Sequence, residues 1–522
     1  MLLQNKILNF INKMVKGFCK SPIYYIVLLA GMTIRIIPFI LNRSLWLDEA
    51  KLSINIVGRS FIGLLQPLDY GQVAPILFLL IEKANLILFG NTEYSLRLFP
   101  LICGLLSLPL MYHFTKSITG SKLTALIALF LISSSVNLIY YSGEVKQYEC
   151  DLFVTLCLLN LVFNHTWPSD NDKRYKLLAI AGSIFIFMSN IAALALFTIA
   201  VYYLFKYGIK FIFRQRIIIV MFSCWTISFA LYYFFFFNGH PNLDYQVNAW
   251  QNDFMPLQIF SSQFITWIFS KFLSVFDFYT VRYAFIFLIA IVFFVIRKQW
   301  LFLYLLIFPM LLHFTISGFK LYPVFPRLIL YLTAFITPML AIAIYDIAVL
   351  IKKWLTIYVA SLVVAGILSL MIIMLVENTY IWNEEEIKRS IDYINTNAWP
   401  DQPVYVYYGA QYATMYYEKI NYIAFKDNII WGKPHRRDAQ NYLNDILSMN
   451  GEVWLLFSHV INYTYPAGGN PANSVHYYNE EDYIMRQLLA SNQVYLLKVF
   501  QTTGSSAYMI KIVHQQSAKA TY

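Results

Sequence analysis

Two adjacent carboxylates, Asp48 and Glu49, directly follow the first long apolar segment of this 522-residue chain. Acidic side chains beside a bilayer are costly, and those that occur there usually serve a function. A carboxylate can take a proton from a hydroxyl when partial burial brings its pKa toward the working pH. The pair therefore predicts a general base at the membrane edge. The structural alternative is a loop carboxylate paired with Arg43 or Lys51.

A second acid, Glu144, lies between two later apolar segments, together with Lys146 and Gln147. If this loop and the Asp48 loop open on the same side, they form an acidic pocket at one membrane face. Such a pocket predicts an enzyme that acts on a lipid-borne substrate. The alternative for this cluster is a solvated turn that contains a Glu–Lys pair.

A third loop carries two cations, Lys320 and Arg327, with Tyr322 between them. Arginine can bind a phosphate through two parallel hydrogen bonds. Arg327 also lies at the predicted start of an apolar segment, where the N-terminus of a helix favours anions. The loop therefore predicts a phosphate site, and the alternative is that its cations extend to lipid head groups.

Membrane helices must position these residues, because the composition is that of a polytopic membrane protein. Hydrophobic residues make up 59% and charged residues 13% of the chain, and the mean hydropathy is +0.56. Soluble domains average about 45–50% apolar residues and about 25% charged residues. The net charge of +11 is dispersed between apolar segments, which argues against nucleic-acid binding. A span needs about 20 mostly apolar residues, and the predicted spans are 23–41, 95–115, 122–141, 149–165, 177–189, 191–206, 217–237, 282–297, 300–318, 328–348 and 355–376.

The distribution of Lys and Arg sets the sidedness, because these residues collect in cytoplasmic loops. The apolar stretch 73–90 contains an acidic and a basic residue and is predicted to lie flat at the interface. With that choice and a cytoplasmic N-terminus, every basic cluster except the 320–327 loop falls inside. The chain then has about eleven transmembrane helices and an extracytoplasmic C-terminus, and the three acids share the outer face.

The composition changes after residue 376, where the chain becomes polar and rich in tyrosine and contains no cysteine. Strand-like runs occur at 403–408, 453–458, 493–500 and 507–513. Helical patterns lie between them, at 436–448 and 479–490. We therefore predict a transmembrane domain over 1–376 and an extracytoplasmic α/β domain over 377–522.

Three stretches occur in a characteristic order: 46–50 with the Asp-Glu pair, 93–100, and 141–148 with Glu144. Together with an Arg-bearing loop before a late span, they make residues 20–345 resemble the GT-C membrane glycosyltransferases. The closest resemblance is to the protein-mannosyltransferase and aminoarabinose-transferase group and its bacterial core-transferase relatives. The stretch 72–75 departs from the His-x-Pro-Pro-like pattern of that group, which leaves the acceptor open.

The resemblance implies transfer of a hexose or pentose from a polyprenyl phosphate to an acceptor hydroxyl on the extracytoplasmic face, usually with inversion. It implies Asp48 as the base, with Glu49 and Glu144 orienting the acceptor and the donor. The candidate ligands of the donor and its phosphate are Lys146, Gln147, Lys320, Tyr322 and Arg327.

The same resemblance implies neither a metal nor another cofactor, and an integral protein of a bacterial inner membrane. Its predicted partners are the lipid-linked sugar, the membrane lipid, and an acceptor that is a glycolipid, a polysaccharide or a protein. The main alternative is a transporter or flippase of a lipid-linked saccharide. Transporters usually place ionisable groups near mid-membrane and show repeated halves, whereas here the acids lie at span ends. A third alternative is an anchor for the C-terminal domain, which does not explain the outer acids.

Overall fold

The computed structural model describes residues 21–164, 171–276, 283–354, 385–434, 439–460, 462–466 and 475–513. Internal contacts divide the chain into two compact units. The membrane unit comprises Met1–Leu41, Phe61–Leu88 and Tyr94–Tyr380. The sheet unit comprises Asn42–Ser60, Phe89–Glu93 and Ile381–Tyr522. The predicted domain boundary at residue 376 lies outside the described residues, so the division into 1–376 and 377–522 stays a prediction.

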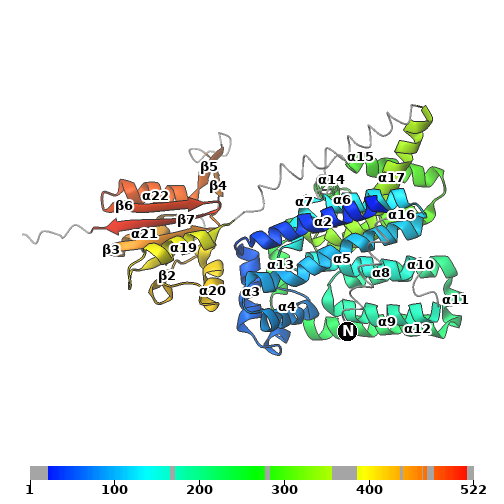
Figure 1. The fold of residues 1–522 in the computed structure, drawn as a ribbon, viewed down its shortest axis with the longest axis horizontal. Helices are drawn as coiled ribbons and strands as arrows, with labels where there is room; N and C mark the ends of the chain where they lie inside the picture. The colour runs from blue at the N-terminus through cyan, green and yellow to red at the C-terminus, as the bar shows by residue number, and fades with distance from the viewer. Residues whose placement is uncertain are drawn as a thin grey trace, which may run out of the picture. The chain divides into compact units, whose positions relative to one another are not determined.

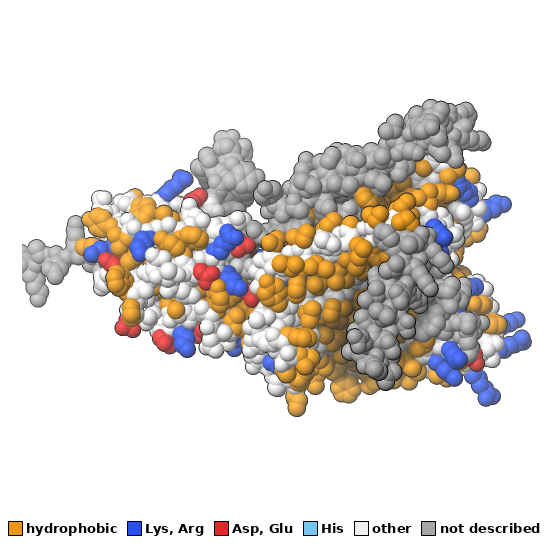
Figure 2. Space-filling model, in the orientation of Figure 1, with side chains coloured by type: hydrophobic (Ala, Val, Ile, Leu, Met, Phe, Trp, Pro, Cys, Tyr) orange, Lys and Arg blue, Asp and Glu red, His pale blue; other side chains and the backbone are white. Residues whose placement is uncertain are grey.

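The membrane unit is built from apolar helices (Figure 1). Figure 2 shows hydrophobic side chains over much of their surface. The helices that carry the predicted spans are α2 (Pro22–Leu41), α5 (Glu93–Thr119), α6 (Lys122–Ser133), α7 (Val136–Ser142), α8 (Tyr148–Phe163), α9 (Asn171–Met188), α10 (Ala192–Tyr207), α12 (Arg216–Tyr232), α15 (Tyr283–Ile296), α16 (Trp300–Gly318) and α17 (Thr333–Trp354). The short α11 (Ile209–Arg214) precedes α12, and a π-helical turn, η2 (Tyr233–Phe237), extends α12.

The predicted polytopic helical class is confirmed. Each predicted span before residue 355 coincides with one helix or with two consecutive ones, and 355–376 lies outside the described residues. Five helices in the described ranges are long and apolar enough to cross a membrane. The count is six if α6 and α7, which are bent by 64° at their junction, form one span. The total of about eleven spans therefore stays a prediction.

The segments between the spans form short helices. The stretch predicted to lie at the interface forms α4 (Ile76–Phe89), a helix of 14 residues. Its length of about 21 Å is less than the hydrocarbon thickness of about 30 Å, which agrees with a helix that does not cross. The segment between η2 and α15 contains α13 (Leu243–Ala249) and α14 (Ser262–Ser274).

The sheet unit contains a five-stranded sheet in the order β2-β1-β3-β7-β6. Strand β1 pairs in parallel with β2 and β3, and β7 pairs antiparallel with β3 and β6. All four predicted strands are present. The short β2 was not predicted, because three partly exposed residues give no periodic signal. The strands are β1 (Val404–Val406), β2 (Ile429–Trp431), β3 (Gly451–Ser458), β6 (Val494–Thr502) and β7 (Ser505–Ile512), beside a separate hairpin of β4 (Asn462–Pro466) and β5 (Val475–Asn479).

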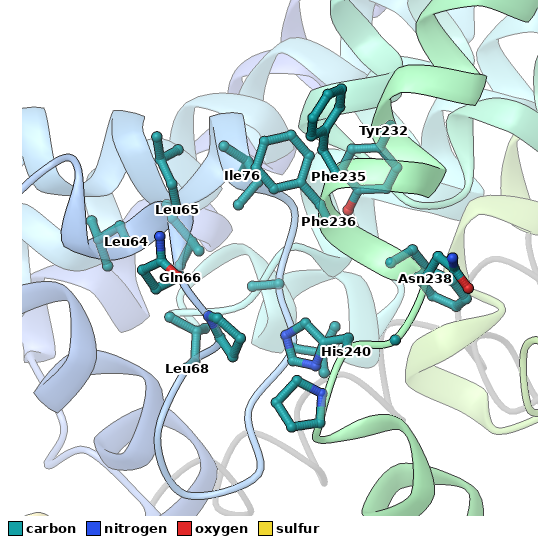
Figure 3. Close-up of a pocket in the computed structure, with 17 residues that line it drawn as sticks. Leu64, Leu65, Gln66, Leu68, Ile76, Tyr232, Phe235, Phe236, Asn238 and His240 are labelled. Atoms are coloured by element: carbon teal, nitrogen blue, oxygen red, sulfur yellow. The ribbon is translucent and has the colours of Figure 1, made fainter.

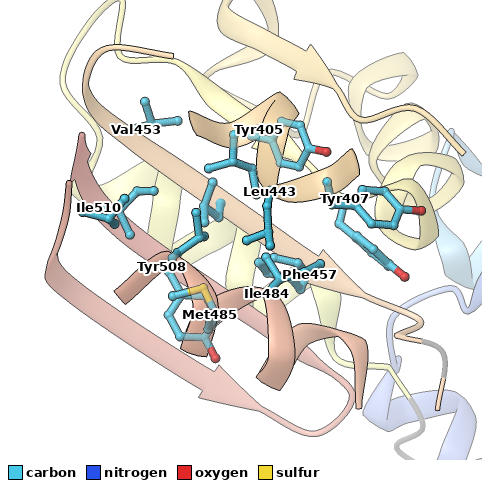
Figure 4. Packing of buried hydrophobic residues seen from close by; sticks show 14 of the residues in the cluster. Tyr405, Tyr407, Leu443, Val453, Phe457, Ile484, Met485, Tyr508 and Ile510 are labelled. Atoms are coloured by element: carbon cyan, nitrogen blue, oxygen red, sulfur yellow. The ribbon is translucent and has the colours of Figure 1, made fainter. Parts of the chain in front are cut away.

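Helices cover both faces of this sheet, which confirms the predicted α/β class. Residues Val453, Leu455 and Phe457 of β3 share a core with α21 (Ala439–Leu447) and α22 (Glu480–Ala490) (Figure 4). Because side chains alternate along a strand, Trp454 faces the other side, where its ring meets Tyr393 of α19 (Ile387–Asn397). A further helix, α20 (Gln411–Lys419), follows β1.

The helix α3 (Leu47–Gly58) belongs to the sheet unit although it lies more than 300 residues earlier in the chain. It packs against α20. The sequence gives no indication of this grouping, since α3 directly follows the first membrane span. The helix that carries the predicted base is thus part of the same compact unit as the C-terminal sheet.

Candidate active site

The first turn of α3 carries both predicted carboxylates, Asp48 and Glu49, at the positive end of the helix dipole. Asp48 is partly exposed, whereas Glu49 is fully buried. An oxygen of Glu49, Oε2, lies 3.7 Å from Nη2 of Arg43. Glu49 thus makes the loop pairing considered above, and Asp48 is the more exposed of the two carboxylates.

The second acidic cluster lies in the sharp turn between α7 and α8, where Glu144 is fully buried. Nζ of Lys146 donates a hydrogen bond of 2.8 Å to Oε1 of Gln72, so the turn is tied to the earlier loop that contains 72–75. Gln147 is also buried, and within the described part of the chain its Oε1 accepts no hydrogen bond. A buried amide oxygen left in this state is costly unless a ligand completes its hydrogen bonding.

The loop 68–72 is held by α13 and the residue that precedes it. Nδ2 of Asn242 donates to the carbonyl oxygens of Leu68 and Gln72, at 2.7 and 3.1 Å. Nε2 of Gln246 donates to the carbonyl oxygen of Gly71 at 2.5 Å. These bonds fix the backbone on which Gln72 meets the second loop.

Gly71 makes this close approach possible. Its φ is +67°, a left-handed conformation that glycine adopts without strain. A Cβ atom at this position would lie 2.5 Å from the ring of Tyr245 in α13. No other residue type therefore fits the turn as it stands.

The guanidinium of Arg327 lies among three aromatic rings. Its central carbon is 5.3 Å from the ring centroid of Trp250, 5.6 Å from that of Phe325 and 5.8 Å from that of Tyr148. Such contacts orient the planar group by cation–π attraction. Nε1 of Trp250 donates to Oε1 of Gln246 at 2.9 Å, which links the Arg327 site to the 68–72 loop.

The expectation that Arg327 begins a helix is wrong. It lies in a 3₁₀ turn, Pro326–Leu328, and α17 starts only at Thr333. Pro323 and Pro326 disfavour helical backbone at the residues that precede them, 322 and 325, so no helix extends into this segment from its N-terminal side. An anion at Arg327 would thus rely on the side chain and not on a helix dipole.

Lys320 and Tyr322, the other two residues of this predicted phosphate loop, have different surroundings from Arg327. Lys320 is exposed on the turn after α16, and in the part of the chain that the structure describes its side chain makes no hydrogen bond or ion pair. The ring of Tyr322 packs edge-on against His313, with centroids 5.6 Å apart. Tyr322 also forms part of a pocket wall.

That pocket has a volume of about 190 Å³ and is almost entirely apolar. Three of its polar wall residues bond within the protein: Ser189 donates to Asp151 at 2.5 Å, and the hydroxyl of Tyr232 donates to Asn190 at 2.6 Å. What remains for a ligand is hydrocarbon surface. The apolar lining comes from Ile186, Ile191, Ala193, Leu194, Phe229, Tyr233, Phe237, Ile316 and Leu321.

A second pocket, of about 150 Å³, lies between the segment 64–79 and η2 with the residues that follow it (Figure 3). It shares Tyr232 and Phe237 with the apolar pocket. Its wall also includes His240, whose pKa burial lowers, so the imidazole is neutral at neutral pH. Single π-helical turns of this kind often occur at functional sites.

The sequence reasoning misses Asn242 and Gln246, which support the site. The only available signal is two amide side chains four residues apart, a spacing that places them on one face of a helix. Gln72 gives no such signal in the sequence, whereas in the structure its Oε1 accepts a hydrogen bond from Lys146.

Part of this region matches a known protein family. Residues 69–145 match the family model of dolichyl-phosphate-mannose-protein mannosyltransferases. The match runs from the 68–72 loop through α4 and α5 to the turn with Glu144. No curated protein matches the sequence.

Among solved structures, the chain is similar to ArnT from Cupriavidus metallidurans bound to undecaprenyl phosphate. The TM-score is 0.51 at 10% identity, over 94% of this chain and 98% of that chain. The apo state of the same ArnT aligns with a TM-score of 0.47 at 12% identity, over 92% and 97%. The family match over 69–145 and the fold shared with ArnT agree with the predicted resemblance: the chain is a membrane protein with the fold of ArnT, and one segment of it matches the mannosyltransferase family model.

Proposed function

We propose that this protein transfers a sugar, a hexose or a pentose, from a polyprenyl phosphate to an acceptor hydroxyl on the extracytoplasmic face of a membrane. The fold similarity to an ArnT structure that contains undecaprenyl phosphate supports this donor class. The family match to enzymes named for a dolichyl-phosphate sugar supports it independently.

The observation that carries the proposal is the apolar pocket beside Tyr322. A lipid-linked donor needs hydrocarbon contact for its chain and a cation for its phosphate. The pocket supplies Ile, Leu and Phe walls, and the loop that begins at its edge leads from Tyr322 to Arg327 within five residues. One short segment thus joins a site for an isoprenoid chain to a site for its head group.

The donor head group would be held by groups of the membrane unit. Arg327, oriented by its aromatic neighbours, can bind the phosphate bidentately and stabilise the charge that develops as it leaves. Lys146 adds a buried cation in the second loop, and Lys320 an exposed one at the end of α16. The amide oxygen of Gln147 can accept a hydrogen bond that a sugar hydroxyl donates.

In the proposed reaction Asp48 takes the proton of the acceptor hydroxyl while the acceptor oxygen attacks the anomeric carbon. The bond from that carbon to the phosphate oxygen breaks, and the lipid phosphate leaves with both electrons. Glu49, held by Arg43, keeps the first turn of α3 in place. Glu144 orients the donor.

The proposed sidedness places the N-terminus in the cytoplasm and the C-terminal domain outside a bacterial inner membrane. Lys and Arg side chains gather at the end of the membrane unit that carries α11, whereas acidic side chains are few there (Figure 2). Such an excess of cations is typical of the cytoplasmic side.

The test is mass spectrometry of envelope glycolipids, polysaccharides and glycoproteins from a deletion strain. The strain is complemented with wild type, Asp48→Asn or Asp427→Asn, the last being an exposed carboxylate of the sheet unit. We expect one glycan to lack a single sugar, and wild type and Asp427→Asn to restore it. Restoration by Asp48→Asn would remove Asp48 as the base. An unchanged glycan profile with a mislocalised lipid-linked precursor would favour a transporter.

A further inference from the structure

Glu93 is the centre of a polar network inside the sheet unit. Nζ of Lys388 donates to its Oε1 at 2.9 Å, and the hydroxyl of Tyr417 donates to the same oxygen at 3.1 Å. Glu93 is 3% exposed. A carboxylate this buried needs its partners, because loss of one leaves an uncompensated charge.

The same two partners also hold the chain just before α3. The backbone N–H of Lys388 donates to Oγ of Ser44 at 3.0 Å. The hydroxyl of Tyr417 accepts from the backbone N–H of Leu45 at 3.4 Å. Two residues of the C-terminal sequence thereby fix the turn that leads into the first turn of α3, three residues before Asp48.

Contacts with α20 continue along α3 (Figure 1). Nζ of Lys51 lies 4.8 Å above the ring of Tyr412. At the far end, a Cβ atom at Gly58 would lie 3.0 Å from Nζ of Lys419. The start of α3 is therefore bonded to α19 and α20, its flank contacts α20, and its end lies close to the last residue of α20.

The start of α3 depends on this network because the helix has no side chain that caps its N-terminus. The residue at that position is Trp46, which offers no oxygen to the first backbone N–H groups. Ser, Thr, Asp or Asn there would fix the first turn locally. Here the tertiary contacts of Ser44 and Leu45 take over that task.

We propose that Glu93, Lys388 and Tyr417 are positioning residues that set the place of Asp48 through α3. The proposal rests on the role of Asp48 as base in the proposed transfer. It makes the C-terminal domain part of the machinery that orients the base. A displacement of about 1 Å at a reacting group can cost about 100-fold in rate, so a loosened network should act on the chemical step.

The test uses the full-length protein in detergent or nanodiscs, with the donor and acceptor found by the complementation experiment. Tyr417→Phe removes the hydroxyl and keeps the ring, and Lys388→Met removes the cation. Tyr508→Phe is the matched control, because it removes a hydroxyl that donates to Glu481 at 2.8 Å elsewhere in the same domain. We expect kcat to fall about tenfold or more in the first two variants, at an unchanged donor KM, and to stay at the wild-type value in Tyr508→Phe.

Two further variants separate positioning from a general loss of structure. Lys388→Arg keeps the charge and should recover most of kcat. In an Asp48→Asn background, Tyr417→Phe should lower the residual rate no further, because residues that act as a unit are not additive. A merely structural residue would lower it again.

The outcomes distinguish this proposal from the proposed function. If Tyr417→Phe and Lys388→Met keep the wild-type kcat while Asp48→Asn is inactive, the positioning proposal fails and the role of Asp48 stands. If Lys388→Met does not fold, Tyr417→Phe and Glu93→Gln decide the question. Wild-type activity in Asp48→Asn would remove Asp48 as the base, and with it the ground of the positioning proposal, while the transfer reaction itself is tested by the glycan profile of the deletion strain.

Discussion

At the scale of single residues, the two neighbouring carboxylates of α3 reach different environments. Successive residues on a helix point about 100° apart, so Asp48 remains accessible while Glu49 turns inward to Arg43. The surroundings of Arg327 likewise decide what its side chain can do. Arg327 is fixed by the faces of three aromatic rings, a setting that suits a planar guanidinium and not a compact ammonium.

Arg327→Lys should therefore impair transfer although it keeps the charge. Lysine cannot stack on Trp250 and Phe325 in the same way or offer two parallel hydrogen bonds to a phosphate. We expect kcat/KM for the lipid donor to fall on the order of 10- to 100-fold, as for loss of one oriented charged hydrogen bond. Steady-state kinetics with the donor as the varied substrate measure it. The control is Arg214→Lys in the exposed α11, and equal activity of the two variants would contradict the assignment.

The sequence predicts charged site residues better than neutral ones. Glu144, Lys146 and Arg327 stand out because charges beside apolar segments are rare and costly. Asn242 and Gln246 do not, because amides are common in loops and carry no such cost. Their partners lie 170 and 175 residues away in the chain, and only the folded structure brings them together.

At the scale of elements, periodicity succeeds where an element buries one face or spans a membrane. It predicts four of the five strands of the sheet and the apolar helices before residue 355. It fails for α3 as a member of the sheet unit, because the helix joins that unit through polar contacts of Ser44 and Leu45 and through α20. Contacts of this kind leave no pattern along the chain.

The packing of α13 on the 68–72 loop leads to a prediction for Gly71→Ala. The variant would place a methyl group against Tyr245 and push the loop away from Gln246. Gly120→Ala is a matched control, because Gly120 also has a φ of +67° but has no atom within 4 Å of its would-be Cβ. Both variants carry the backbone cost of roughly 1–2 kcal/mol.

We expect Gly71→Ala to lose most of the transfer activity, and Gly120→Ala to retain it with a similar drop in melting temperature. Activity and thermal unfolding measured on the same purified samples separate the two effects. If Gly71→Ala is as active as Gly120→Ala, the packing of α13 on the loop has no bearing on the site.

At the scale of the whole molecule, the chain combines a bundle of membrane helices with a sheet unit that includes an early segment, Asn42–Ser60. The connection constrains topology, because α2 ends at Leu41 and the next residue already belongs to the sheet unit. Whichever side of the membrane holds the C-terminal domain must also hold the end of α2 and the whole of α3. The side of the sheet unit and the side of Asp48 are therefore one question.

Cysteine labelling answers that question with two positions in a variant whose native cysteines are replaced. Ser448→Cys lies at an exposed position directly after α21, and Lys210→Cys lies on the exposed, basic α11. In intact spheroplasts a membrane-impermeant maleimide should label Ser448→Cys, and should label Lys210→Cys only after permeabilisation, because basic segments collect on the cytoplasmic side. The reverse pattern would put Asp48 on the cytoplasmic side. The base would then face the wrong compartment for transfer outside, and the apolar pocket would have to serve a donor taken from the inner leaflet.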